Sequence, residues 1–108
     1  MNETNKTIFS VPTSSELEQL AELHKALGDY TRIKILWHLM KQECCVSELA
    51  QKIEVTESAI SHQLHELRIA RLVRSRKDGK KVFYSIQDEH IQWILEETYA
   101  PHISERYP

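Results

Sequence analysis

The chain of 108 residues is poor in glycine and in cysteine, and both shortages exclude classes of protein. With two glycines and no long loop, it offers little room for the substrate pocket of an enzyme. Its two cysteines, Cys44 and Cys45, are adjacent, and adjacent cysteines pair only with strain, so a disulfide framework does not fit. We therefore expect reduced thiols and no enzymatic activity.

Long apolar runs are also missing. No run approaches the roughly 20 residues that a membrane-spanning helix needs. The first twelve residues contain one lysine and no apolar segment, so they do not resemble a secretory signal. We expect a cytoplasmic protein with a flexible, polar N-terminal arm over residues 1–13 and a single domain over residues 14–108.

A positive net charge, which would suggest a nucleic-acid partner, is absent as well, since the sum is −2. The distribution matters more than the sum. Residues 68–81 contain seven basic residues and one acid, Asp78, whereas residues 89–108 contain four glutamates and one arginine. A charge run is often only a solvated surface, but the Asp78-Gly79 turn signal inside this run favours a basic hairpin.

The first half of the chain shows helical periodicity. Ser15 and Glu18 match a capping box, and Gly28 ends the helix that follows them. Asp29 can cap a second helix over residues 30–41. The apolar positions recur with helical spacing in both segments: Leu17, Leu20, Ala21, His24 and Leu27 in the first, and Ile33, Leu36, Trp37 and Met40 in the second.

Residues 46–69 have the pattern of a helix-turn-helix. A short helix over residues 46–53, with Val46, Leu49, Ala50 and Ile53 inward, is followed by the link 54–56, whose Thr56 can cap the next helix. In that helix Ile60, Leu64 and Leu67 share one face, and the opposite face is polar and uncharged. Because Ser, His and Gln can address base edges, we predict that this helix reads the major groove of DNA through Ser58, Ser61, His62, Gln63 and His65.

Two β-like runs follow, at residues 72–76 and 81–86, and they alternate with a period of two around Asp78-Gly79. Basic side chains along this hairpin would lie beside phosphates and supply affinity without sequence information. The predicted phosphate contacts are Arg74, Arg76, Lys77, Lys80 and Lys81.

A last helix begins near Asp88, its predicted N-cap, and carries an inner stripe of Ile91, Ile94, Leu95 and Thr98. A domain of this size does not need the apolar faces of both its first and its last helix. Pairing with a second copy would bury them and would match a two-fold symmetric DNA site. The predicted fold is mostly α with a small β-hairpin: a dimeric winged helix-turn-helix with four helices, a hairpin and a fifth helix in that order.

Several motifs carry a family resemblance over residues 22–105. LHKALGDYTRIKIL (residues 23–36), ECCVSELA (43–50), SAISHQLHELRIARLVRSRKDGKKVFYSI (58–86), DEH (88–90) and HISE (102–105) occur in the order of the ArsR/SmtB family of bacterial metal-responsive repressors, which the chain therefore resembles. The last two motifs are similar to the ligand pattern of the zinc-sensing branch.

The resemblance implies a homodimer that binds operator DNA when metal-free and releases it when metal binds, and that controls genes for metal efflux or sequestration. It implies a metal site on the last helix, with Asp88 and His90 from one subunit and His102 and Glu105 from the other. Two imidazoles and two carboxylates suit tetrahedral Zn²⁺, for which Co²⁺ or Cd²⁺ could substitute.

The chain departs from the family pattern at Pro101. Eleven residues separate His90 from His102, one more than the family has, which turns His102 by about 100° on a straight helix. Since Pro101 cannot donate a helical hydrogen bond, we expect a π-bulge or kink between residues 97 and 101 that restores the register. If the helix stays regular, Glu97 is the next candidate ligand.

Three alternatives stay open. The thiolate branch of the family has two cysteines where this chain has Cys45 and Ser47, so a thiolate metal site would be incomplete. A repressor of the same family could instead answer thiol chemistry at Cys44 and Cys45, or an organic ligand. A winged helix can also serve as a protein-interaction module.

Overall fold

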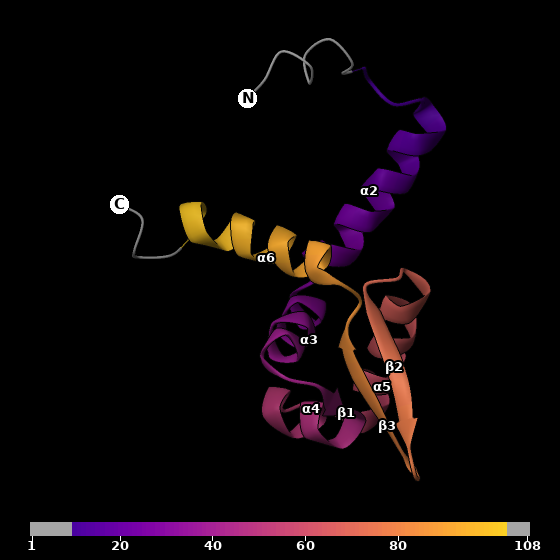
Figure 1. Ribbon diagram of the computed structural model, residues 1–108, viewed down its shortest axis with the longest axis vertical. Helices are drawn as coiled ribbons and strands as arrows, with labels where there is room; N and C mark the ends of the chain where they lie inside the picture. Colours follow the sequence, from indigo (N-terminus) through magenta and orange to yellow (C-terminus); the bar gives the residue numbers. More distant parts are fainter. Residues whose placement is uncertain (1–9, 104–108) are drawn as a thin grey trace.

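The computed structural model describes residues 10–103, which contain five helices and three strands (Figure 1). In chain order these are α2 (Ser14–Gly28), α3 (Tyr30–Lys41), β1 (Cys44–Cys45), α4 (Val46–Ile53), α5 (Glu57–Ile69), β2 (Val73–Asp78), β3 (Lys81–Ile86) and α6 (Glu89–His102). The predicted order of four helices, a hairpin and a fifth helix is confirmed. The prediction missed β1, which pairs antiparallel with β3 and gives a sheet of order β1-β3-β2. A two-residue strand is too short to show a period in the sequence.

The helix starts follow from their caps. Asp29, Thr56 and Asp88 are N-caps as predicted, and each side chain accepts a hydrogen bond from a backbone N–H of the first turn. The prediction for the first helix was wrong by two residues. Its capping box is formed by Thr13 and Glu16, with hydrogen bonds of 3.2 and 2.9 Å. Thr13–Glu16 and Ser15–Glu18 both fit the spacing of a capping box, and the Thr13–Glu16 box gives the longer helix.

The hairpin turn also lies one residue later than predicted. Asp78 pairs with Lys81 at the end of the ladder, so the loop consists of Gly79 and Lys80. Gly79 has a φ of 64°, and no positive φ occurs at Lys80. A glycine with positive φ at the first loop position is the pattern of a type II′ turn, whose twist suits the two strands.

The core is formed mainly by α3, α4 and α5. Ile60, Leu64 and Leu67 of α5 are fully buried, as their spacing predicted. The other members of this core cluster are Ala26, Ile35, Leu36, Leu39, Cys44, Leu49, Ala50, Ile53, Leu72, Val73 and Leu95. This packing fixes α5 and the base of the hairpin relative to one another.

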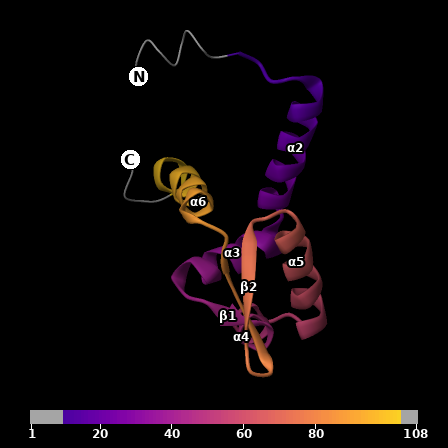
Figure 2. The same cartoon turned by 45° about the vertical axis from the view of Figure 1, so that its right-hand side comes forward.

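The first and last helices extend from this core. Both lie at one end of the molecule, and the tip of the hairpin lies at the other (Figures 1 and 2). The radius of gyration is 16.4 Å, whereas a compact domain of this length has about 13 Å. Among the α6 residues whose burial the structure describes, 89–100, Leu95 is the buried one, and α2 buries Ala26. Within the described residues no helix is both long and apolar enough to cross a bilayer.

Candidate nucleic-acid interface and metal ligands

Four of the five residues predicted to read DNA are exposed on the outward face of α5, and their role stays a prediction. Ser58, Ser61, His62 and His65 are all exposed. Thr56 caps the helix by accepting a 3.1 Å hydrogen bond from the backbone N–H of Ala59. The buried residues of the opposite face hold this helix in a single rotation about its axis, so the polar side chains are presented together.

Gln63 lies elsewhere. Its side chain is half-buried, and its Oε1 accepts a 2.6 Å hydrogen bond from Nε of Arg32 on α3. Gln63 is three residues after Ile60, so it sits on the flank of α5 next to the core and not on the outer face. The structure therefore places this predicted reader at a helix–helix contact.

A groove of about 370 Å³ separates the hairpin from the start of α5 and α4. Lys80 and Lys81 of the hairpin line it opposite Ser61 of α5. Ser47 and Glu57 line the same groove, and neither was among the residues predicted to contact DNA. The signal for both was their place in the first turn of a helix of the helix-turn-helix, because those turns approach DNA in this motif.

The predicted phosphate contacts divide between the two faces of the hairpin. Ser75 accepts a 3.1 Å hydrogen bond from Arg68 of α5, so the face that carries Ser75 is turned toward α5. Side chains alternate along a strand, and Arg74 and Arg76 therefore lie on the opposite face. Lys77 shares the face of Ser75, while Lys80 lies in the turn.

Arg76 is engaged in an ion pair. Its Nε and Nη2 atoms each lie 2.7 Å from a different carboxylate oxygen of Glu43, which immediately precedes β1. The hydrogen bond from Arg76 lowers the pKa of Glu43, and the same bond raises the pKa of Arg76. Its guanidinium also lies 5.0 Å from the ring centroid of Phe83. No sequence signal pointed to this pair, because 33 residues separate its members.

The first half of the predicted metal site lies at the start of α6. Asp88 Oδ1 accepts hydrogen bonds from the backbone N–H groups of His90 and Ile91, at 3.0 and 3.2 Å. Nδ1 of His90 lies 3.7 Å from the same oxygen, and the imidazole is 87% exposed. Cap formation uses one carboxylate oxygen of Asp88 and leaves the other oxygen for a metal ion. A carboxylate and an open imidazole on one turn are donors that fit a divalent metal ion.

The second half, His102 and Glu105, is outside what the structure describes, apart from the backbone of His102 as the last residue of α6. The prediction of a π-bulge was wrong, while its alternative, a kink, stays a prediction. The helix is α-helical from Glu89 to His102, and the N–H of Ile103 donates a 2.9 Å bond to the carbonyl of Tyr99 across Pro101. Pro101 is tolerated here because its missing donor affects one hydrogen bond close to the end of the helix. Among the residues described, no cluster of three or more potential metal ligands occurs.

Both cysteines are buried and free. Cys44 Sγ donates to the carbonyl of Gln42 at 3.4 Å, and Nζ of Lys52 lies 3.8 Å from that sulfur. Burial raises the pKa of the Cys44 thiol. Cys45 Sγ lies 3.2 Å from Oγ of Ser47. Both thiols pack inside the domain, and burial favours the protonated form of Cys44.

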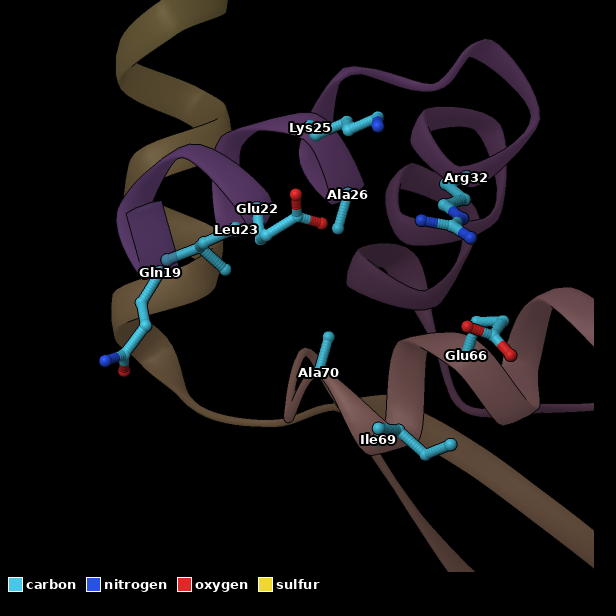
Figure 3. A pocket seen from close by; sticks show the side chains of 9 residues that line it. All are labelled: Gln19, Glu22, Leu23, Lys25, Ala26, Arg32, Glu66, Ile69 and Ala70. Carbon is cyan, nitrogen blue, oxygen red and sulfur yellow. The ribbon is translucent and has the colours of Figure 1, made fainter. Parts of the chain in front are cut away.

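A further groove, of about 430 Å³, lies between α2, α3 and α5 (Figure 3). Ala26 of α2 and Ala70 after α5 point toward one another across it (Figure 3). Its rim carries two acids, Glu22 and Glu66, and two bases, Lys25 and Arg32. The balanced charges favour neither an anionic nor a cationic ligand.

Comparison with known proteins agrees with this architecture. The family model of the bacterial regulatory proteins of the arsR family matches residues 29–75. A transcriptional repressor SmtB homolog of Synechocystis sp. is 41% identical over 95 residues, which cover 88% of this chain and 71% of that protein.

Two solved structures show the same fold. The solution structure of apo-NmtR aligns with a TM-score of 0.72 at 34% identity and covers 94% of this chain and 91% of that one. The antimony-specific transcriptional repressor AntR aligns with a TM-score of 0.74 at 27% identity and covers 91% and 88%. With its winged helix-turn-helix and these relatives, this chain belongs to the arsR family of bacterial transcriptional regulators.

Proposed function

We propose that this protein is a homodimeric repressor that binds operator DNA when metal-free and releases it when Zn²⁺, or a similar divalent ion, binds at α6. The observation that carries the metal part is the pair formed by Asp88 and His90, whose oxygen and nitrogen are 3.7 Å apart at the exposed start of α6. His102 and Glu105 of the other subunit would complete the four ligands. A relative that is an antimony-specific repressor supports metal or metalloid control of this fold.

The apolar surface of α2 and α6 supports the dimer. Leu17 and Leu20 of α2 are 40% and 43% exposed, and Trp93 of α6 is 62% exposed. An apolar groove of about 420 Å³ lies between these helices and α3, and Leu27, Trp37 and Ile94 are among its lining residues. A second copy would remove this surface from water and would supply a second α5 helix for the other half-site of a two-fold symmetric operator.

Metal and DNA would then compete through the geometry of the dimer. Metal that joins the two subunits would stabilise one arrangement of the two α5 helices, and DNA would stabilise another. The coupling is reciprocal, so DNA weakens metal binding by the factor by which metal weakens DNA binding. Couplings of about 1–3 kcal/mol are typical and correspond to a change in affinity of several-fold to about 100-fold.

The test uses a duplex that the wild-type protein itself selects from a random-sequence pool. Fluorescence anisotropy of that duplex is followed as Zn²⁺, Co²⁺, Ni²⁺ or Cd²⁺ is added. We expect the His90→Ala/His102→Ala double variant to bind the duplex like the wild type and to lose release by zinc. Zinc-driven release that survives in this variant would place the sensing site elsewhere.

A matched control removes a different histidine. His38 on α3 lines a groove formed by α3 residues, so the His38→Ala variant should retain its zinc response. The regular helix at Pro101 makes Glu97 the alternative to His102 as a ligand. Single variants Glu97→Gln and His102→Ala, compared in the same titration, show which of the two holds the metal.

The runner-up is a repressor of the same family that senses thiol chemistry at Cys44 and Cys45. The contact between Cys45 and Ser47 favours it, since a sulfur and a hydroxyl oxygen 3.2 Å apart form a small polar site beside the groove. Its prediction differs from that of the metal sensor. Peroxide would release the selected duplex from the wild type but not from a Cys44→Ala/Cys45→Ser variant.

A further inference from the structure

The bidentate ion pair of Arg76 crosses the whole sheet. Arg76 lies on β2, and its guanidinium lies over Phe83, its direct partner on the central strand β3. From there it reaches Glu43, at the edge formed by β1, with two bonds of 2.7 Å. One side chain thus joins the outer hairpin strand to the segment that connects α3 with α4.

The geometry of this pair leaves little of Arg76 for DNA. Two of its nitrogen atoms are committed to Glu43, and Nη1 lies 3.7 Å from a carboxylate oxygen of Asp78. Lys80 and Lys81 line the groove beside Ser61, and Arg76 is not among its lining residues. Lys81 shares the strand face of Arg76 but lies next to the turn, at the end of the ladder. A phosphate held between the hairpin and α5 would meet the lysines and not Arg76.

The ladder that joins β1 to the hairpin is short. β1 has two residues, so the ladder with β3 contains the pairs Cys44–Tyr84 and Cys45–Phe83 alone. The hairpin itself is held near its base by Leu72 and Val73, which are buried, while its tip is exposed. The pair of Glu43 and Arg76 adds a side-chain connection to this short ladder, on the strand face opposite the one that Arg68 joins to α5 through Ser75.

We propose that Glu43 is a positioning residue for DNA binding: it holds the hairpin at a fixed angle to α5 through Arg76. This inference deepens the proposed function, because it rests on DNA binding by α5 and the hairpin. The fixed angle lets the lysines of the hairpin meet phosphates while α5 lies in the groove. Loss of the pair therefore weakens binding to a selected duplex and leaves binding to unrelated DNA nearly unchanged, since a loose hairpin can still follow any phosphate chain.

The experiment measures the affinity of Glu43→Gln and Arg76→Gln for the selected duplex and for a scrambled duplex of equal length, over a range of salt concentrations. We expect both variants to bind the selected duplex about threefold to tenfold more weakly, the scale of one good ion pair. The double variant should be no weaker than the singles. The salt slope should stay at the wild-type value, because no phosphate contact is lost.

A charge swap separates positioning from direct contact. Glu43→Arg combined with Arg76→Glu restores an ion pair with the opposite orientation and should regain most of the lost affinity. Glu66→Gln, which removes the same charge from α5 beside the groove of Figure 3, is the control and should bind the selected duplex like the wild type. Amide exchange of the hairpin, measured without DNA, should accelerate in Glu43→Gln and slow again in the swap.

The outcomes are distinguishable. A salt slope that falls by about one in Arg76→Gln, with equal weakening on both duplexes, shows that Arg76 contacts a phosphate and overturns the inference. Unchanged affinity of Glu43→Gln for the selected duplex also overturns it. If the wild type enriches no duplex at all, the proposed function fails, while the exchange measurement still tests the tie between Glu43 and the hairpin.

Discussion

Helices α5 and α6 differ in how the chain holds them. Helix α5 buries three large side chains completely, Ile60, Leu64 and Leu67. Helix α6 buries Leu95 and leaves Trp93 and Tyr99 exposed to 62% and 45%. The orientation of α5 is fixed by packing within its own domain, whereas such packing fixes the orientation of α6 only in part.

The difference matches the two tasks in the proposed function. A reading helix must keep one rotation so that the same side chains meet the same bases. A helix that carries the signal must be able to change its partner contacts when metal binds. Within the described residues, the aromatic contact of α6 is an edge-to-face pair between Tyr99 and Trp37 of α3, with ring centroids 5.4 Å apart. Such pairs contribute about 0.5–1.5 kcal/mol, which ties α6 to α3 without immobilising it.

The largest expected effect breaks the fixed helix. Leu64→Ala removes a fully buried side chain and should lower the free energy of unfolding by about 2–5 kcal/mol at any protein concentration. Trp93→Ala on α6 should lower it by less than about 0.5 kcal/mol at concentrations where the protein is monomeric. Urea unfolding followed by circular dichroism measures both. Equal losses in the two variants would contradict the comparison between α5 and α6.

The next prediction tests what covers the exposed helices. Leu20→Glu places a charge on the apolar face of α2 and should raise the dissociation constant of the proposed dimer by about tenfold or more, because an unpaired charge would be buried there. Analytical ultracentrifugation measures the dissociation constant. Ile69→Glu, on an equally apolar and 65% exposed position of α5, is the matched control and should leave the constant unchanged. A dimer that tolerates Leu20→Glu does not use this face.

The smallest effect concerns the hairpin, which belongs with the fixed region. Arg76 keeps the pKa of Glu43 below its usual range in the folded state. A carboxyl group with a depressed pKa contributes stability above the pKa of the unfolded chain, about 4.3, and that contribution is lost as pH falls through the folded value. The wild type should therefore lose more stability between about pH 5 and pH 3 than Glu43→Gln does. Urea midpoints at the two pH values provide the comparison, and identical losses would show that the pair contributes nothing.

Much of the fold could be predicted because its signals are local. The caps at Asp29, Thr56 and Asp88 and the apolar spacing of α5 each depend on residues within a few positions of one another. The errors were local ambiguities too. Two overlapping capping patterns compete at the first helix, and the Thr13–Glu16 box forms in place of the predicted Ser15–Glu18 box. The hairpin signal at Asp78-Gly79 located the turn to within one residue, since the register depends on pairing that the turn dipeptide does not specify.

The DNA-facing residues could be predicted less completely from the sequence than the fold could. Exposed positions on α5 follow from periodicity, which is why Ser58, Ser61, His62 and His65 were placed on the outer face. Gln63 looked like one of them by residue type, yet its partner Arg32 comes from a helix 31 residues earlier. Arg76 looked like a phosphate contact by charge, and its partner Glu43 lies 33 residues earlier in the sequence.

The amino-acid sequence by itself determined which segments form helices and strands and that a basic hairpin follows a polar reading helix, because caps, turns and periodicity act over one or two turns of chain. Only the tertiary structure decided which charged and polar side chains remain available for DNA. Availability depends on whether an opposite charge from a distant segment lies within hydrogen-bonding distance. That distance is set by packing of the core, which brings β1 beside β3 and α3 beside α5.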